Sequence, residues 1–561
     1  MRSLRLHLAY KNIRRLRQIV TVLVRHGFHP LMERLHLTRL ISVPGRIIGK
    51  KIAREKESVT PAVRLRLALE ELGPTFIKTG QILSTRPDIL PDEYVTELLK
   101  LQDEVPPVPF KKALKVIESE LKKPVGEAFS RIDETPIAAA SIAQVHRAVT
   151  ASGEEVVIKI QRPGIEAVID TDISILKYLA RLAVRYIPES KPYDPQGMVD
   201  EMSSIIKKEL DFTLEGSYTE RFRENFKDDP RVIVPCVYWD LSARRILTVD
   251  RVRGTKVDRV KKLHERGIDT EKVAHLLVDI FFKQVFDHGL FHGDLHSGNI
   301  FVIDENKIAL VDFGIVGRLD RSMQHNLADI LINMAGEDFE ALTRIYMRMG
   351  ILPEGIDRPR FEREYYDTML CYFGRPLKYV SFGELLMDYI KLAARHNVRF
   401  PRELLLFDKC LIELEGLARV LFPDVNVLEE SAPYAKKLFT RRFSPTTVFE
   451  ETASLLSDYR NFLTDFPRKA DRIMKDTLEG KLRIEFLHRG LEDFMGEMDR
   501  SSNRLTFGLI VAALVIASSL VITSGAKPDL FGYPALGVIG FIVASCLGLW
   551  LLIQILRSGK F

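Results

Sequence analysis

Cysteine is scarce in this chain, which has only four among 561 residues, at positions 236, 371, 410 and 546. None of them forms a C-x-x-C pair, and none has a histidine at the spacing of a zinc ligand. The sequence therefore argues against a disulfide framework and a zinc site, and favours a reducing compartment. Internal repeats and low-complexity tracts are also absent from the sequence, so a repeat architecture is not expected.

A large net charge is missing as well, because 82 Lys and Arg face 76 Asp and Glu, for a sum of +6. The average composition therefore does not indicate a nucleic-acid-binding protein. Residues 1–56 differ from the average, with fourteen basic and two acidic side chains, so this segment is +12 and the remainder is −6. Such asymmetry predicts a polyanionic partner. No basic platform interleaved with aromatic residues supports nucleic acid as that partner.

Long apolar runs are lacking at the start of the chain, where the longest, Ile19–Val24, has six residues. A secretory signal is therefore not expected there. Two uncharged runs near the other end, residues 505–524 and 535–556, each have 20 or more residues. At about 1.5 Å per residue each run spans roughly the 30 Å of a bilayer core, so we expect two transmembrane helices. The alternative is a pair of buried core helices.

The flanks of these runs predict an orientation. Only Lys527 and Asp529 carry charge between the runs, whereas basic residues flank their outer ends: Arg500, Arg504, Arg557 and Lys560. The positive-inside rule places both ends of the hairpin in the cytoplasm. Small residues on both runs would allow close packing. With a membrane implied, residues 1–56 are expected to lie against anionic headgroups; the alternative is a solvated basic helical face.

The pattern between these segments indicates an α+β body. Helices are expected over residues 62–103 and 110–130, followed by a β-hairpin over residues 143–160 with its turn at Ser152-Gly153. Helical periodicity returns at 165–226. Strand-like runs cover 232–240 and 244–252, helices follow over 257–288, and a second hairpin covers 300–312. Beyond residue 320 the pattern is helical up to the two apolar runs.

Three motifs stand at informative spacing. His292-Gly293-Asp294-Leu295-His296-Ser297-Gly298-Asn299 comes first, and Asp312-Phe313-Gly314 follows eighteen residues after Asp294. Lys159 ends the apolar run Val156–Lys159 further upstream. Each piece alone has an ordinary explanation as a turn or a surface lysine. In this order they match the protein-kinase signature of a strand lysine, a catalytic aspartate with asparagine five positions later, and D-F-G.

Phosphoryl transfer explains why these residue types are needed. The nucleotide phosphates require a cation from the protein, and Lys159 would pair with them. Asp312 and Asn299 would hold Mg²⁺, since hard cations take oxygen ligands. Asp294 would orient or deprotonate the attacking hydroxyl or water.

Features of ordinary protein kinases are missing. No G-x-G-x-x-G precedes Lys159, and alanines stand there instead. Gly293 occupies the place where kinases carry an arginine before the catalytic aspartate, and no A-P-E follows D-F-G. A peptide-docking platform is therefore not expected, and a protein substrate becomes doubtful.

With these features, residues 62–320 resemble the UbiB/ADCK family of atypical protein-kinase-like ATPases, which are linked to ubiquinone and isoprenoid-lipid metabolism. Lys78-Thr79-Gly80-Gln81 is similar to the family's K-x-G-Q motif, with Thr79 a small departure, and Glu209-Leu210-Asp211 is similar to its E-x-D motif. The basic lead-in and the terminal hairpin resemble those of bacterial UbiB.

The resemblance implies roles for individual residues. It implies catalytic roles for Asp294, Lys159 and Glu215, the last as the partner of the lysine. It implies that Lys78, Gly80, Gln81, Glu209 and Asp211 belong to a lid that covers the site and excludes peptides. Nucleotide contacts are implied for Lys159, for Asp250 and for an alanine-rich loop of Ile137, Ala138, Ala139, Ala140, Ser141, Ile142, Ala143, Gln144 and Val145. Asn299 and Asp312 are the implied metal ligands.

The implied fold is protein-kinase-like, with a small sheet-containing N-lobe, a helical C-lobe, an N-terminal helical extension and a C-terminal two-helix transmembrane hairpin. The predicted divisions are a basic segment (1–60), a K-x-G-Q extension (61–130), an N-lobe (131–253), a C-lobe (254–440), a helical linker (441–504) and two transmembrane helices (505–524 and 535–556).

The hypothesis that follows is a membrane-anchored, Mg²⁺- and ATP-dependent enzyme that supports quinone biosynthesis at a bacterial inner membrane. It would hydrolyse ATP or phosphorylate a small or lipid-like acceptor, and it would also bind ADP. Expected partners are membrane lipids, quinone intermediates and quinone-biosynthesis enzymes, with a homodimer left open. A true protein kinase and a nucleotide-gated scaffold or lipid-extraction protein are the alternatives.

Overall fold

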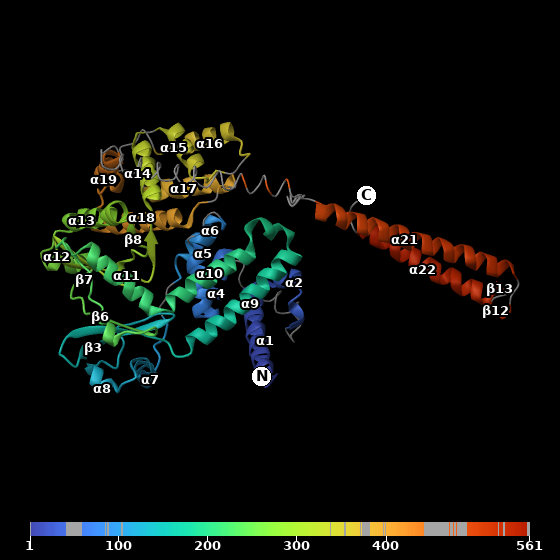
Figure 1. Cartoon of the computed structure of the whole chain (residues 1–561), viewed down its shortest axis with the longest axis horizontal. Coiled ribbons are helices and arrows are strands. Elements are labelled where there is room, and N and C mark those ends of the chain that lie inside the picture. Colours follow the sequence, from blue (N-terminus) through green and yellow to red (C-terminus); the bar gives the residue numbers. More distant parts are fainter. Residues whose placement is uncertain are drawn as a thin grey trace. The chain divides into compact units, whose positions relative to one another are not determined.

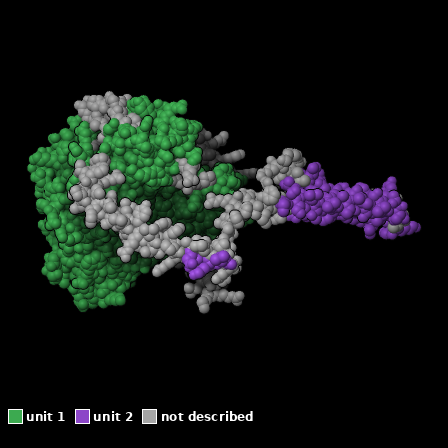
Figure 2. Space-filling view, turned by 45° about the horizontal axis from the view of Figure 1, so that its top comes forward, with its two compact units in different colours: residues 1–449 green, residues 450–561 purple. Residues whose placement is uncertain are grey.

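The computed structural model describes residues 2–40, 59–84, 86, 89–101, 105–336, 338–352, 355–370, 372, 382–396, 398, 400–442, 471, 475, 478, 491–524, 527–530 and 533–557. Contacts divide the chain into two compact units, residues 1–449 and residues 450–561 (Figure 2). Most of the predicted linker over 441–504 lies outside the described residues.

An antiparallel sheet forms the first lobe of the larger unit (Figure 1). Its strands run in the order β1 (Phe129–Ile132), β3 (Ala143–Thr150), β4 (Glu155–Gln161) and β6 (Ile246–Asp250), with β2 (Ala138–Ala139) paired to β3. The predicted hairpin is confirmed by the pairing of β3 with β4. Val156, Ile158 and Ile160 alternate along β4 and are fully buried with residues of α7 (Phe110–Leu121). The alternation therefore sends Lys159 to the opposite face of β4.

Two sequence expectations were wrong in detail. The helix expected over 110–130 ends at Leu121, because Lys122 takes a left-handed conformation (φ 54°) and Pro124 follows; α8 (Val125–Ala128) and β1 occupy the remainder. Of the strand expected over 232–240, only β5 (Val232–Ile233) forms. Pro235, which has no N–H to donate to a ladder, follows shortly after it.

Helices from before and after the sheet pack together. α1 (Arg2–Arg25), α4 (Pro61–Leu72), α5 (Pro74–Ser84), α6 (Asp92–Leu98) and α9 (Ile165–Tyr186) share one apolar cluster. α2 (His29–Arg34) extends this packing in a second cluster. Arg15 on α1 donates to Asp172 on α9 at 2.7 Å, and to the carbonyl of Leu72. The described part of the basic segment is thus built into the helical extension.

α10 (Pro195–Glu209) and α11 (Phe212–Asn225) complete the predicted helical stretch after β4. The second lobe surrounds the phenylalanine-rich α13 (Thr270–Lys283), which continues into a π-helical turn at Gln284–His288. The small strands near it are β7 (Thr255–Lys256), β8 (Leu290–His292), β9 (Ile300–Asp304), β10 (Lys307–Leu310) and β11 (Val316–Arg318). The second predicted hairpin is confirmed by the pairing of β9 with β10.

Helices follow as expected wherever the structure describes the chain after residue 320. They are α14 (Arg321–Ala335), α15 (Phe339–Arg348), α16 (Arg358–Leu370), α17 (Phe382–Arg395), α18 (Arg402–Leu421) and α19 (Val427–Arg442). The short α12 (Val260–Glu265) lies earlier in the chain, before α13. α18 packs against α13, and buried residues face most directions around it. α18 is therefore a largely buried helix in the interior of the second lobe.

The smaller unit is a helical hairpin of α21 (Leu491–Thr523) and α22 (Ala535–Arg557), with β12 (Asp529–Leu530) and β13 (Tyr533–Pro534) at its turn. Ser501–Thr523 and Ala535–Ile553 are long and apolar enough to cross a membrane, and only 6% and 11% of these windows are buried. This exposure rules against buried core helices. The helices approach closely at Gly540, where an added Cβ would lie 2.2 Å from the Ser518 hydroxyl. Small residues do allow the close packing, as expected.

Candidate active site

Three charged side chains from distant parts of the chain meet between the lobes of the larger unit. The Lys159 ammonium on β4 donates to both carboxylate oxygens of Glu215 on α11, at 2.8 and 2.9 Å. It also donates to both oxygens of Asp312, at 3.1 Å each. Asp312 follows β10 and has a φ of 62°, a left-handed conformation that aspartate tolerates better than most residues. Lys159 therefore links the sheet, α11 and the D-F-G turn.

The pKa values of this cluster follow from burial opposed by pairing. Burial by itself would lower the pKa of Lys159, but the carboxylates of Asp312 and Glu215 outweigh burial and raise it. Burial raises the pKa of Glu215 to about 7, against the lowering effect of Lys159. Burial also acts to raise the pKa of Asp312, but Lys159 outweighs it and holds that pKa below its usual range. Asp312 is thus the carboxylate that stays ionised at neutral pH.

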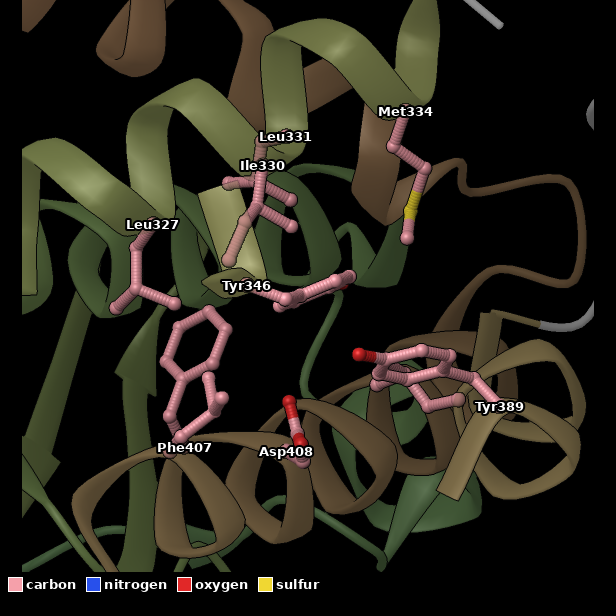
Figure 3. A pocket seen from close by; sticks show the side chains of 10 residues that line it. Leu327, Ile330, Leu331, Met334, Tyr346, Tyr389, Phe407 and Asp408 are labelled. Atoms are coloured by element: carbon pink, nitrogen blue, oxygen red, sulfur yellow. The ribbon is translucent and has the colours of Figure 1, made fainter. Parts of the chain in front are cut away.

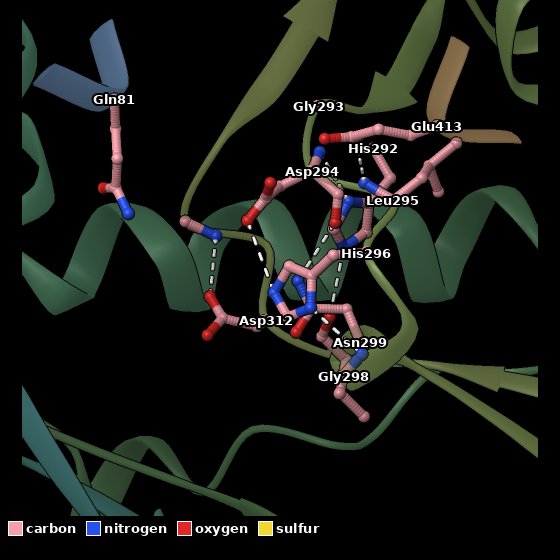
Figure 4. Close-up of polar contacts among 12 residues, drawn as sticks. Gln81, His292, Gly293, Asp294, Leu295, His296, Gly298, Asn299, Asp312 and Glu413 are labelled. Carbon is pink, nitrogen blue, oxygen red and sulfur yellow. Dashed lines mark hydrogen bonds and ion pairs between the residues drawn. The ribbon is translucent and has the colours of Figure 1, made fainter. Parts of the chain in front are cut away.

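Hydrogen bonds from the side chains of His292 and Asn299 fix the loop that follows β8 (Figure 4). His292 Nδ1 accepts from the Asp294 backbone N–H at 3.1 Å, while Nε2 donates to the Val311 carbonyl at 3.0 Å. Burial lowers the pKa of His292, which keeps the ring neutral and able to accept. The Asn299 side-chain amide donates to the Asp294 carbonyl at 3.0 Å, which leaves the Asn299 amide oxygen as an acceptor. Asp294 and Asn299 are therefore fixed relative to each other.

Two charged residues of this site were not found from the sequence. Lys409 on α18 donates to Asp294 Oδ1 at 2.9 Å and lies 3.3 Å from Glu413, one turn further along the same helix. Glu413 in turn accepts from the Leu295 backbone N–H at 3.1 Å. Neither residue belongs to a local motif, and α18 reads as an ordinary amphipathic helix. No signal in a single sequence links it to a loop more than a hundred residues earlier.

The alanine-rich loop forms a tight turn between β2 and β3. Ala140 N–H donates to the Ala143 carbonyl at 2.8 Å, and Arg162 holds the turn by donating to the Ala140 carbonyl at 2.8 Å. Gln144 is buried, and its side-chain oxygen accepts from the Val108 N–H at 2.9 Å. Ser141 is fully buried, and its hydroxyl has no hydrogen-bond partner among the described residues. The structure places the other residues predicted for this loop in and around the two strands. Ala138 and Ala139 form β2 and Val145 lies in β3, while Ile137 directly precedes β2 and Ile142 directly precedes β3.

The predicted lid residues lie on α5 and α10. The Lys78 ammonium is 3.3 Å from a Glu209 carboxylate oxygen, and both side chains are largely buried, with 13% and 9% exposed. Gly80 is required by packing, because an added Cβ would lie 2.3 Å from Leu101. Gln81 donates to the Leu101 carbonyl at 3.3 Å. Thr79, the departure from the family pattern, is buried and donates to the Thr75 carbonyl one turn earlier.

Two predicted residues are placed differently from the others. Asp211 is the N-cap of α11, where it accepts from the Thr213 N–H at 3.1 Å, so it orients the helix that carries Glu215. Asp250 pairs with Val156 in the sheet, on the face opposite Lys159. Its carboxylate accepts from the Cys236 N–H at 3.0 Å and the Tyr238 hydroxyl at 2.9 Å. The structure therefore does not bring the Asp250 side chain to the Lys159 cluster.

The donors present suit magnesium better than a softer metal. Among the described residues, no group of three or more His, Cys, Asp and Glu could hold a metal ion by itself. The Asp312 carboxylate and the Asn299 amide oxygen are hard oxygen donors, and Mg²⁺ commonly takes one or two such protein ligands together with phosphates and water. These residues fit a cation that arrives with a nucleotide. The lobes, the lysine–glutamate pair and the aspartate–asparagine loop define a kinase-like protein.

Comparisons with known proteins agree with this class. Family models match as the ABC1 atypical kinase-like domain (residues 100–346), the UbiB helical domain (367–426) and the ABC1/UbiB kinase-like C-terminal domain (489–557). A "Probable protein kinase UbiB" from Pseudomonas putida strain W619 is 34% identical over 97% of this chain and 99% of its own length. One from Pseudomonas fluorescens is 37% identical over 78% and 83%. The chain belongs to the ABC1/UbiB family of atypical kinase-like proteins.

Other matches add little on function. An uncharacterized protein in the hydrogenase 1 5′ region of Clostridium pasteurianum is 33% identical over 98% of this chain and 99% of that protein. The solved complex of Rv3197 with erythromycin from Mycobacterium tuberculosis covers 69% of this chain and 97% of its own, with 23% identity and a TM-score of 0.48. A TM-score this low supports neither a fold nor a function for this chain. Its membership of the ABC1/UbiB family therefore depends on the family models and the curated relatives.

Proposed function

We propose that this protein is a membrane-anchored atypical kinase-like ATPase that uses Mg²⁺·ATP and supports ubiquinone or related isoprenoid-quinone biosynthesis. The observation that carries the proposal is the Lys159–Glu215–Asp312 cluster next to the Asp294–Asn299 loop. A lysine paired to a glutamate, a carboxylate held ionised and an oriented amide are what phosphoryl transfer requires of a protein. The role in quinone biosynthesis comes from the resemblance to the UbiB family.

In this proposal each polar residue of the site has its own role in phosphoryl transfer. Lys159 neutralises nucleotide phosphate charge while Glu215 fixes its position. Asp312 and Asn299 offer oxygen ligands for Mg²⁺, which would neutralise the charge that develops during transfer. Asp294 accepts a hydrogen bond from the attacking hydroxyl or water and orients it. Burial acts to raise the pKa of Asp294, but Lys409 outweighs it and lowers that pKa. Asp294 is therefore a weak base whose main contribution is orientation.

The acceptor is water or a small or lipid-like group. The sequence lacks the A-P-E segment of peptide-docking kinases. The K-x-G-Q helix α5 contacts α9 and α10 of the kinase-like body, and an ion pair fastens it there. In this proposal α5 covers the site, which favours an acceptor smaller than a protein, and the apolar hairpin favours one that is reached from a bilayer.

The membrane part of the proposal depends on the hairpin and on charge. We place the hairpin in a bacterial inner membrane with the kinase-like unit in the cytoplasm, because basic residues flank its outer ends. On α1, Ile13, Arg14 and Arg17 are exposed and would suit an anionic lipid surface.

The proposal is tested with the full chain in lipid nanodiscs supplied with Mg²⁺·ATP. The wild-type protein should release phosphate, and Asp294→Asn should lower kcat by about 10²-fold or more because the acceptor loses its oriented carboxylate. Asp200→Asn, which changes an exposed aspartate paired with Lys177, is the control and should keep full activity. Wild-type turnover by Asp294→Asn would contradict the role of this residue.

A true protein kinase remains the second candidate, because the relatives are named probable protein kinases. A phosphorylated protein whose labelling requires Lys159 would favour it. Restored quinone synthesis in a deletion strain that carries Asp294→Asn would instead favour a nucleotide-gated scaffold or lipid-extraction protein.

A further inference from the structure

The catalytic loop contains no permanent cation of its own. Residues 290–299 include only histidines as basic side chains. Gly293, directly before Asp294, cannot carry any side chain, because an added Cβ would lie 2.7 Å from Ile315 Cγ2 and 3.0 Å from the Ile315 carbonyl oxygen. The position that holds an arginine in ordinary kinases is therefore closed by backbone packing. A cation for Asp294 has to come from another element.

α18 supplies that cation. Lys409 reaches Asp294 Oδ1 at 2.9 Å, and its side chain is 17% exposed while that of Asp294 is 31% exposed. The ammonium thus lies on the protein side of the carboxylate. The other oxygen, Oδ2, has the more exposed His296 ring 3.6 Å away. Of the two Asp294 carboxylate oxygens, Oδ1 therefore accepts from Lys409 on the buried side, whereas Oδ2 lies on the more exposed side of the site.

Glu413 holds the lysine in place. It lies one helical turn after Lys409, 3.3 Å from its ammonium, and its second oxygen accepts from the Leu295 N–H at 3.1 Å. The Glu413 carboxylate therefore binds both the Lys409 ammonium and the loop that contains Asp294. A largely buried triad of charges gains little net stability compared with apolar side chains of the same size. Its placement on Asp294 is better explained by function than by stability.

We propose that Lys409 is a positioning residue for the reaction, held by Glu413, that keeps the Asp294 carboxylate oriented toward the phosphoryl acceptor. This inference rests on the proposed function. It gives the helical domain, which contains α18, a direct role at the site.

The test compares variants of the full chain in nanodiscs with Mg²⁺·ATP. Lys409→Met removes the charge, and Lys409→Arg keeps it. Lys272→Met is the matched control, because Lys272 pairs with Glu305 at the same 2.9 Å but on an exposed surface. We expect Lys409→Met to lower kcat by about 10- to 100-fold while KM for ATP changes by less than about threefold. Lys409→Arg should recover much of kcat, because a guanidinium can still donate to the Asp294 carboxylate.

Glu413→Gln provides a second route if Lys409→Met does not fold, which thermal melting with and without Mg²⁺·ADP would reveal. This variant loosens Lys409 without burying an unpaired Asp294, so kcat should fall by a smaller factor than in Lys409→Met, while KM for ATP again changes by less than about threefold. Wild-type kcat in both Lys409→Met and Glu413→Gln would overturn the inference while phosphate release by the wild type upheld the proposed function. No phosphate release by the wild type would refute both.

Discussion

Asp408 and Lys409 are neighbours on α18 but have opposite surroundings. Successive helix residues point about 100° apart, so Lys409 reaches the catalytic loop while Asp408 faces a cavity lined by apolar and aromatic side chains, among them Tyr346, Tyr389 and Phe407 (Figure 3). Asp408 is 5% exposed, and burial raises its pKa to about 8. This carboxyl is therefore largely protonated at neutral pH.

Asp408 should make the stability of the fold depend on pH. Between about pH 4 and pH 8 the unfolded chain loses the Asp408 proton and the folded chain keeps it, so stability falls as pH rises and levels off above pH 8. Asp408→Asn cannot ionise, so it should raise Tm by on the order of 5 °C at pH 8 and by clearly less at pH 5. Thermal melts at both pH values measure this, with exposed Asp240→Asn as the control. An equal shift at both pH values would contradict the assignment.

The helix α5 packs against several helices and is paired to one of them by charge. α5 contacts α4, α6, α9 and α10, and its Lys78–Glu209 pair joins it to α10. Asp211, two residues after Glu209, caps α11, so one short segment connects the Lys78–Glu209 pair to the helix that positions Glu215. The two ion pairs, Lys78–Glu209 and Lys159–Glu215, are therefore connected through adjacent helix ends.

Loss of the lid pair should loosen α5. Lys78→Met removes a cation from a largely buried carboxylate, at a cost on the order of 2 kcal/mol, and amide exchange in residues 74–84 should accelerate. The double variant Lys78→Met/Glu209→Gln should recover part of the protection, because no buried charge is left. Lys207→Met is the control, since Lys207 pairs with Asp170 at the same 3.3 Å on an exposed surface. Equal exchange rates in the Lys78 and Lys207 variants would refute a role for the pair.

At the scale of the whole molecule, the basic segment (residues 1–56) and the apolar hairpin lie in different parts of the sequence. Part of the basic N-terminal segment is neutralised by ion pairs from Arg15, Arg25 and Arg34 to Asp172, Glu71 and Glu189. The net charge of residues 1–56 together with these acidic partners is therefore smaller than +12. Only 6% and 11% of the two apolar windows of the hairpin are buried, which makes the hairpin the main candidate for an anchor.

The proposed topology predicts the accessibility of the hairpin turn. Lys527 is exposed at that turn, so Lys527→Cys should react with a membrane-impermeant thiol reagent in intact spheroplasts, above the background of the native cysteines. Glu127→Cys, exposed on the kinase-like unit, should react only after lysis. Labelling of Glu127→Cys in intact spheroplasts would invert the orientation that we propose.

Features that depend on local spacing could be predicted from the amino-acid sequence alone. The two hairpins, the apolar helices and the order of Lys159, Asp294 and Asp312 could be predicted because side-chain periodicity and short motifs act over a few residues. Helix ends and strand lengths near Pro124 and Pro235 were less predictable, since one left-handed residue or one missing donor decides them.

The charged residues that meet at the active site from distant parts of the chain could be identified only from the tertiary structure. It brought Lys409 to Asp294 across 115 residues and turned Asp250 away from Lys159. It also showed Thr79 to be buried and bonded to its own helix. The physical reason is that burial and pairing fix where a charge is stable, and both depend on neighbours that a single sequence does not reveal.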